Sequence, residues 1–212
     1  MTDIDHWLEQ VYQAGGDQAT LNRVYDAWAA EYDRHLWSIG NPFIAIAAGL
    51  AGRYIPEFDA AILDAGCGTG NLGQVLHQIG YRRIDGLDPS TGMLELANRK
   101  EVYENLFQLS LGVEASLPAK RYDAVVSTGV LTSGHATPAA LDDMLNLVKP
   151  GGVIIFSLSE LAWENLGFSE KIAEFTHRSL WVEQEHSRLF RAHPFSAEEA
   201  HVKLWVYVYR KY

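Results

Sequence analysis

The sequence predicts an α/β fold in which a parallel sheet is covered by helices on both faces. From about residue 60 onwards, short apolar runs alternate with segments whose apolar residues recur at helical spacing. The runs are apolar throughout, as strands buried on both faces of a parallel sheet are. Strands that alternate with helices favour parallel pairing through helical crossovers.

The core elements follow in chain order. The first strand ends in a glycine cluster, and Gly80 ends the helix that follows it. Ser90 can N-cap the next helix, and Thr137 and Pro138 begin a later one. The predicted core strands are residues 61–64, 84–87, 106–111, 122–127 and 153–158.

The two ends of the chain have different patterns. Residues 202–209 alternate between apolar and more polar side chains, and we expect them to pair antiparallel with residues 180–190. The first 55 residues read as helices around 7–14, 21–36 and 42–54. We therefore predict one domain over 1–212. It comprises an N-terminal helical lid (1–55), a cofactor-binding core (56–160), and a last helix with a C-terminal β-hairpin (161–212).

Composition and charge exclude several classes. The chain has 212 residues, 48% of them hydrophobic, and 17 basic against 27 acidic side chains give a net charge of −10. This balance argues against nucleic-acid and anionic-membrane partners. The single cysteine, Cys67, excludes an intramolecular disulfide, and His186, His193 and His201 lack metal-ligand spacing, so we predict no metal. The acidic N-terminus lacks the features of a signal peptide, which predicts a cytoplasmic protein.

The glycine cluster carries the first functional signal. Gly68, Gly70 and Gly73 form a G-x-G-x-x-G pattern, which alone is a weak dinucleotide signal. Asp64 before it would repel a pyrophosphate but can favour the ammonium of S-adenosylmethionine, directly or through water. Asp88, at the end of the next strand, can accept both ribose hydroxyls, a role equally useful with NAD.

These residues resemble the class I S-adenosylmethionine-dependent methyltransferases. The matching stretches follow the family's order and together span about half the chain: residues 62–70, 86–93, 122–127 and 148–153. The resemblance implies a Rossmann-like seven-stranded sheet of order 3-2-1-4-5-7-6, with strand 7 antiparallel. A closer likeness, to the methyltransferase-like proteins of the Williams–Beuren syndrome region, rests on residues 25–33, 111–114, 117–118 and 129–134. This closer likeness does not indicate which substrate the protein methylates.

The resemblance also implies a set of cofactor contacts. Many relatives carry an acidic residue after the glycine at position 112, where this chain has Val113 followed by Glu114. We predict that Val113 offers backbone and apolar contact to adenine and that Glu114 supplies the polar contact. The full predicted set is Tyr32, Asp64, Gly66, Cys67, Gly68, Asn71, Asp88, Pro89, Met93, Val113, Glu114 and Thr128.

Methyl transfer needs a base only when the acceptor must lose a proton. His135, just after the fourth strand, is the candidate base, with a merely solvated loop histidine as the alternative. Four aromatic residues in the N-terminal helices have two interpretations, helix packing or a lid in which Tyr32 touches the cofactor. They are Tyr25, Trp28, Tyr32 and Trp37.

The sequence thus predicts a methyltransferase that uses S-adenosylmethionine and acts on an oxygen or nitrogen of a small molecule by in-line transfer. The alternatives are a protein methyltransferase and a non-catalytic S-adenosylmethionine-binding regulatory protein, with a nicotinamide dehydrogenase more distant. The predicted partner is the small-molecule substrate, with the chain a monomer or a homodimer.

Overall fold

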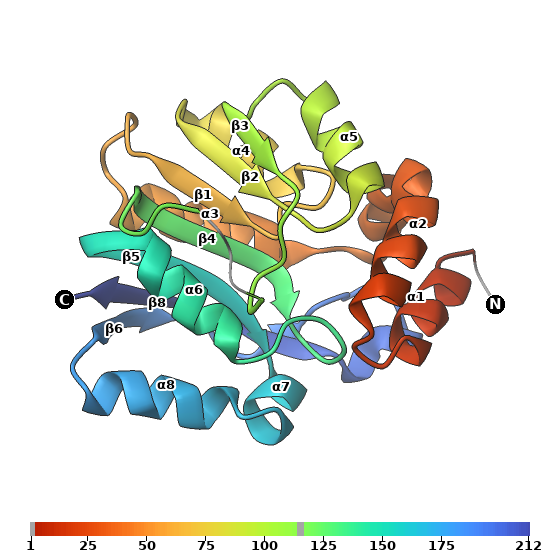
Figure 1. Ribbon diagram of the computed structural model, residues 1–212. Helices are drawn as coiled ribbons and strands as arrows, with labels where there is room; N and C mark the ends of the chain where they lie inside the picture. The colour runs from red at the N-terminus through yellow and green to blue at the C-terminus, as the bar shows by residue number, and fades with distance from the viewer. Residues whose placement is uncertain (1–2, 114–116) are drawn as a thin grey trace.

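A mixed β-sheet lies between two layers of helices in the computed structural model, which describes residues 3–113 and 117–212 (Figure 1). The strands are β1 (Ile62–Ala65), β2 (Ile84–Leu87), β3 (Asn105–Phe107), β4 (Tyr122–Leu131), β5 (Val148–Ser159), β6 (Trp181–His186), β7 (Phe190–Arg191) and β8 (Lys203–Lys211). The helices are α1 (Asp3–Gln13), α2 (Gln18–Ile39), α3 (Pro42–Tyr54), α4 (Asn71–Ile79), α5 (Thr91–Arg99), α6 (Ala139–Leu147), α7 (Glu160–Asn165), α8 (Phe168–His177) and the 3-10 helix η1 (Glu198–His201).

The strand order confirms the predicted topology. The order is β3-β2-β1-β4-β5-β8-β6, and β8 pairs antiparallel with both β5 and β6. The sheet has one strand more than predicted, because the partner expected over residues 180–190 is split. The Ser187 N–H donates to the Val206 carbonyl of β8, and the Val206 N–H donates to the Ser187 hydroxyl. The two-residue β7 then pairs with the first residues of β8. Two helices, α7 and α8, replace the last helix expected between the core and the hairpin.

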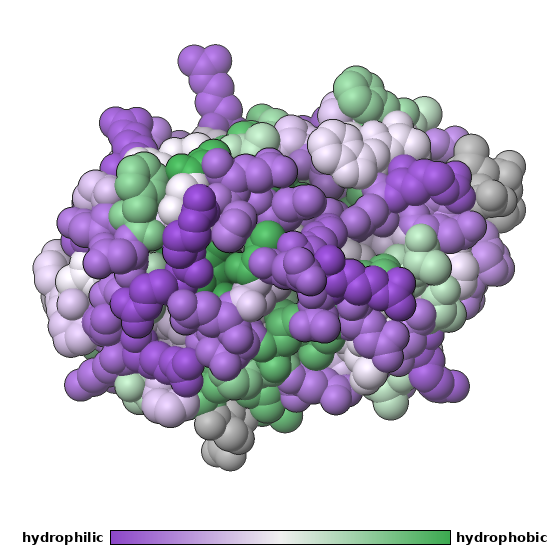
Figure 2. All heavy atoms as spheres, turned by 90° about the horizontal axis from the view of Figure 1, so that it is seen from above, coloured by the Kyte–Doolittle hydropathy of each residue, from purple (hydrophilic) through white to green (hydrophobic). Residues whose placement is uncertain are grey.

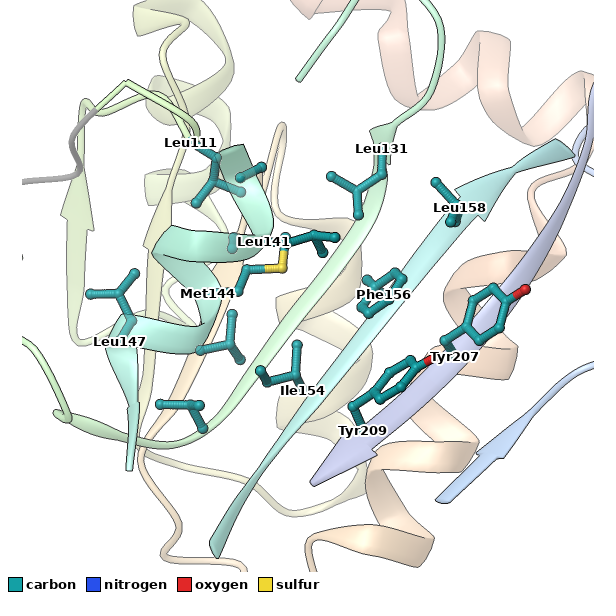
Figure 3. Packing of buried hydrophobic residues seen from close by; sticks show 14 of the residues in the cluster. Leu111, Leu131, Leu141, Met144, Leu147, Ile154, Phe156, Leu158, Tyr207 and Tyr209 are labelled. Carbon is teal, nitrogen blue, oxygen red and sulfur yellow. The ribbon is translucent and has the colours of Figure 1, made fainter. Parts of the chain in front are cut away.

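Both faces of the sheet are buried, as the apolar strands predict. In β5, Ile154 and Phe156 contribute to one core cluster, which includes residues of α6 and α8. Val153 and Ile155 contribute to the opposite cluster, which includes residues of α3 and α4. Figure 3 shows the first cluster, in which the Phe156 and Tyr209 rings stack with centroids 5.8 Å apart. This packing fixes the strand ends on which the candidate site is built.

The N-terminal helices divide into two groups. The small side chains of α3, among them Ala47 and Ala51, are buried against the sheet, so this helix belongs to a covering layer. Helices α1 and α2 bury a separate cluster that includes Leu21, Trp28 and Leu36. Of the segment predicted as a lid over residues 1–55, only α1 and α2 thus stand apart from the sheet layers, and α2 packs on α5.

One face of the molecule is largely polar. Seen from above Figure 1, hydrophilic side chains cover most of this face, with an apolar strip between them (Figure 2). Within residues 3–113 and 117–212, no helix combines the length and apolar character needed to span a membrane.

Candidate cofactor and acceptor site

The glycine loop after β1 is held against the end of β2. The backbone N–H groups of Gly66 and Cys67 both donate to the carbonyl of Leu87, over 2.8 and 2.9 Å. Gly66 has φ of 81°, and a Cβ there would lie 2.2 Å from Cγ2 of Val130. Only glycine fits this position. At Gly66 the loop therefore presents its backbone without a side chain, at the carboxyl end of the sheet, where open α/β sheets bind ligands.

A cavity of about 990 Å³, part of it open to solvent, lies between this loop, the ends of β2 and β4, and α2. Most of the predicted cofactor residues line it together with the predicted base, namely Tyr32, Gly66, Cys67, Gly68, Asn71, Asp88, Pro89, Met93, Thr128 and His135.

Among the described residues, Asp88 is the only one that contributes a carboxylate to the lining of this cavity. Its Oδ2 accepts the N–H of Gly68 and its Oδ1 the N–H of Ser90, each at 2.9 Å. Burial raises the pKa of Asp88 to about 6, although these two hydrogen bonds oppose the shift. A carboxylate has about four lone-pair sites, so each oxygen can still accept one further hydrogen bond.

Asp64 lies behind the glycine loop and does not line the cavity. Its Oδ2 accepts the Gly73 N–H at 3.1 Å and the Tyr103 hydroxyl at 2.7 Å, while Oδ1 is buried with no hydrogen-bond partner. Burial raises its pKa to about 7. That Asp64 favours an ammonium group of the ligand stays a prediction. Its Oδ1 is the atom that a nearby donor would supply with a hydrogen bond.

The loop after β3 departs from the predicted adenine contacts. Val113 follows the turn at Gly112, its side chain is 71% exposed, and it does not line the cavity. The neighbouring Ser110 and Leu111 do line it. The family resemblance did not indicate these two, because the family pattern points to the residue after the glycine. Glu114 lies outside the described residues.

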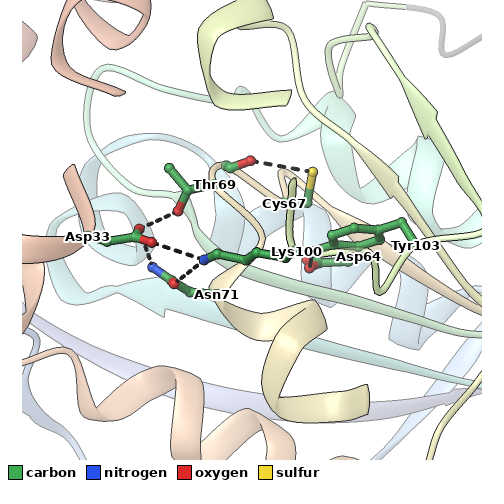
Figure 4. Close-up of polar contacts among 8 residues, drawn as sticks. Asp33, Asp64, Cys67, Thr69, Asn71, Lys100 and Tyr103 are labelled. Carbon is green, nitrogen blue, oxygen red and sulfur yellow. Dashed lines mark hydrogen bonds and ion pairs between the residues drawn. The ribbon is translucent and has the colours of Figure 1, made fainter. Parts of the chain in front are cut away.

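A polar cluster fastens α2 to the glycine loop (Figure 4). The carboxylate of Asp33 accepts hydrogen bonds from the Thr69 hydroxyl, from the Asn71 amide at 2.8 Å and from the Lys100 ammonium at 3.0 Å. Lys100 also donates to the amide oxygen of Asn71 at 2.6 Å. Asn71, predicted as a cofactor residue, thus lines the cavity and also joins the loop to α2.

A second aspartate of the same helix holds the start of α5. Asp26 accepts the Ser90 hydroxyl at 2.6 Å and the Gly92 N–H at 2.8 Å. Asp26 and Asp33 are seven residues apart, which places them on one face of a helix. That spacing is the one signal in the sequence from which the two anchors could have been predicted. Together their contacts hold α2 over the cavity.

His135 lies between the loop after β4 and α2. Its Nδ1 lies 3.1 Å from the carbonyl of Ser133, so this nitrogen carries the proton and donates. The hydroxyl of Tyr25 then donates to Nε2 over 2.5 Å. Burial lowers the pKa of His135 and raises the pKa of Tyr25 well above its usual range. The pair is therefore neutral at neutral pH, with Nε2 as its basic atom.

A second cavity, of about 700 Å³, adjoins the first. The two share wall residues from α2 and from the loop after β4, including Tyr25, Tyr32 and His135. The rest of its wall comes from α1, the end of β5 and the segment before β8. The polar members of that wall are Tyr12, Thr132, Ser133, Ser157, Ser159, His193 and Glu199.

The charge of the first cavity favours S-adenosylmethionine over NAD. In the part of the chain that the structure describes, no lysine or arginine lines it. A pyrophosphate would therefore meet the Asp88 carboxylate without a compensating side-chain cation. A nucleoside that carries an ammonium and no phosphate fits the wall. The described residues also contain no group of three histidine, cysteine, aspartate or glutamate side chains placed to hold a metal ion.

Comparison with known proteins places the chain in a family. A family model described as "Methyltransferase domain" matches residues 46–198. Human Methyltransferase-like protein 27 is 33% identical over 141 residues, which cover 65% of this chain and 57% of that protein. A malonyl-(acyl-carrier protein) O-methyltransferase of Serratia marcescens is 32% identical over 122 residues, 54% of this chain and 47% of the relative. The chain thus spans about half the length of these curated relatives.

Solved structures show the same fold. A magnesium protoporphyrin IX methyltransferase from Synechocystis PCC 6803, solved with bound S-adenosylmethionine, superposes with a TM-score of 0.64. The match covers 89% of this chain and 95% of that one at 16% identity. Because the family model covers most of the chain and the fold agrees with it, this protein belongs to the methyltransferase domain family, and S-adenosylmethionine is its cofactor.

Proposed function

We propose that this protein transfers a methyl group from S-adenosylmethionine to an oxygen or nitrogen atom of a small molecule held in the second cavity. The observation that carries the proposal is the shared wall of the two cavities at Tyr25, Tyr32 and His135. One cavity fits the donor, the other offers room for an acceptor, and the neutral pair of Tyr25 and His135 lies where they meet. In-line transfer requires this adjacency of donor and acceptor.

Different residues of the first cavity would bind different parts of the donor. Asp88 would accept the two ribose hydroxyls with its free lone pairs. The apolar side chains of Met93 and Leu111 would cover the adenine, and the bare backbone of the glycine loop would meet the methionine end. When bound, the cofactor supplies a methyl carbon on a positively charged sulfur, which leaves as a neutral thioether.

Tyr25 and His135 act together as the base. The acceptor atom forms its bond to the methyl carbon with its own lone pair and must then lose a proton. That proton passes to the Tyr25 oxygen while the Tyr25 proton passes to Nε2 of His135 over the existing hydrogen bond. Burial disfavours a free phenolate at Tyr25, so the two transfers are coupled. Of the two residues, Tyr25 would touch the acceptor and His135 would hold the proton.

Helices α1 and α2 exclude water from the junction. Asp26 and Asp33 hold α2 on the loops that bind the cofactor, and Tyr25 and Tyr32 of α2 lie in the walls of both cavities. Trp28 and Tyr32 meet edge to face with ring centroids 4.7 Å apart. Both interpretations of this aromatic set therefore apply to Tyr32, which packs within the helices and also lines the donor cavity. A dry site strengthens the electrostatic contacts inside it.

Two measurements test the proposal. Calorimetry should show that S-adenosylmethionine and S-adenosylhomocysteine bind the chain, whereas NAD should not. A panel of small molecules, and in parallel a panel of proteins, should then be scored by release of S-adenosylhomocysteine. Turnover with a small molecule supports the proposal. Turnover with proteins only would favour a protein methyltransferase, and binding without any turnover a regulatory protein. Failure of both sulfur nucleosides to bind would refute it.

A further inference from the structure

Aromatic side chains form part of the wall of the second cavity. Its rings come from α1, α2 and α3, and within the described residues no lysine or arginine lines it. The aromatic members are Tyr12, Tyr25, Trp28, Tyr32 and Phe43. Ring faces attract cations and offer nothing specific to anions. An acceptor with a carboxylate or phosphate would enter this cavity without an ionic partner.

One buried carboxylate completes the wall. Glu199, in η1, is only 5% exposed, and its Oε2 accepts the Tyr12 hydroxyl at 2.6 Å. Its backbone N–H donates to the Ser196 hydroxyl at 3.1 Å, which holds the turn in place. The other carboxylate oxygen, Oε1, is not among the buried atoms that lack a hydrogen-bond partner, so it remains accessible to solvent or to a ligand. Glu199 can therefore receive a further donor or a cation.

The neighbouring histidines do not neutralise Glu199. His193 lines the same cavity, and its Nδ1 lies 2.9 Å from the carbonyl of Gly40, which only accepts, so Nδ1 carries the proton. Burial lowers the pKa of His193, although the charge of Glu199 opposes the shift, and burial also lowers the pKa of His135. Both rings are thus neutral at neutral pH, and among the described residues Glu199 is the only acidic side chain of the wall.

We propose that the acceptor is a small organic amine, held as an ammonium by Glu199 among the aromatic rings of the second cavity. This inference rests on the proposed function and adds the substrate class to it. The ammonium is the recognition group, and the atom that takes the methyl group lies at the junction with the donor cavity, near Tyr25. Glu199 is then a specificity-determining residue, and carboxylates are rejected.

The proposal separates this chain from some of its relatives. Several relatives are named for an acceptor that carries a malonyl group, and a malonyl group ends in a carboxylate. The wall described here has no cation for such a group. We therefore expect this chain not to share that acceptor, although it shares the donor site.

The test uses compounds that differ in one group. Aryl-ethyl and alkyl scaffolds, each as a primary amine, an alcohol and a carboxylate, are titrated into the protein saturated with S-adenosylhomocysteine. We expect amine members to bind and carboxylate members not to bind. Binding of the carboxylates, or of no amine, would overturn the proposal. Failure of S-adenosylhomocysteine itself to bind would instead refute the proposed function, so the two failures are distinguishable.

Three variants test whether Glu199 causes the preference for amines. Glu199→Gln should weaken the amine by at least about thirtyfold, the effect of removing one partner of a buried charge pair, and leave the alcohol unchanged. Glu198→Gln removes the same charge from the exposed neighbour in η1 and should change neither. Tyr12→Phe removes the hydroxyl but keeps the carboxylate, so the preference for the amine should persist. Equal behaviour of Glu199→Gln and Glu198→Gln, or loss of the preference in Tyr12→Phe, would contradict the assignment.

Discussion

Replacement of Asp88 by asparagine tests how the donor is held. The carboxylate already accepts the N–H groups of Gly68 and Ser90, one on each oxygen. Asparagine keeps one oxygen and places an NH₂ group where the other was, so one ribose hydroxyl loses its acceptor and the charge is lost. A hydrogen bond to a charged group contributes about 1.5–3 kcal/mol. At pH 7 we therefore expect Asp88→Asn to weaken S-adenosylhomocysteine about tenfold to a hundredfold.

The pH dependence sharpens this prediction. Burial raises the pKa of Asp88 to about 6, and the ionised form is the one that accepts from the ribose. About ten elevenths of the groups are ionised at pH 7 and about one eleventh at pH 5, by ordinary titration. The advantage of the wild type over Asp88→Asn should therefore fall about tenfold between pH 7 and pH 5.

The assay is calorimetric titration of S-adenosylhomocysteine into both proteins at pH 5, 6 and 7. The control is Asp59→Asn, which removes the same charge from an exposed position. We expect the control to follow the wild type at each pH. If the ratio of wild-type to Asp88→Asn affinity stayed constant across these values, or if Asp88→Asn bound as well as the control, the reasoning about Asp88 would be refuted.

Further predictions concern catalysis, the lid and stability. Tyr25→Phe should lower kcat about a hundredfold with an accepted substrate and leave the affinity for S-adenosylhomocysteine within twofold, measured by turnover and calorimetry. Asp33→Ala removes three hydrogen bonds to α2, so amide exchange in α2 should accelerate. Burial raises the pKa values of Asp64 and Asp88 in the folded state, to about 7 and about 6. The folded protein therefore binds more protons, and the stability that these groups contribute below about pH 4 should be lost as the pH rises to 7, measured by denaturant unfolding without cofactor. Phe156→Ala should cost about 3–5 kcal/mol in the same assay, because the side chain is fully buried.

The regular part of the fold could be predicted because its signals are local. Apolar runs and helical spacing located β1, β2, β5 and α3, and the predicted strand order is confirmed. Other features depend on tertiary contacts. The split of the hairpin partner into β6 and β7 depends on Ser187 bonding to β8, and alternation along the chain does not reveal such a bond.

In the candidate site, too, the residues that depend on tertiary contacts were harder to predict than those that follow a local pattern. The glycines and Asp88 could be named because they follow strand ends directly, and strand ends meet at one edge of a parallel sheet. The partners of Tyr25, Asp33 and Glu199 could not be predicted, because each partner lies 36 or more positions away in the sequence, as the contact between Asp33 and Thr69 shows. Val113 was assigned from a family pattern, and the turn at Gly112 leaves it exposed.

The most direct test of the central claim is a crystal structure of this chain with S-adenosylhomocysteine. We predict that the ribose hydroxyls lie on the Asp88 carboxylate and that the sulfur lies at the junction of the two cavities, within reach of an acceptor beside Tyr25 and His135. An empty first cavity, or a nucleoside bound elsewhere on the molecule, would contradict the account.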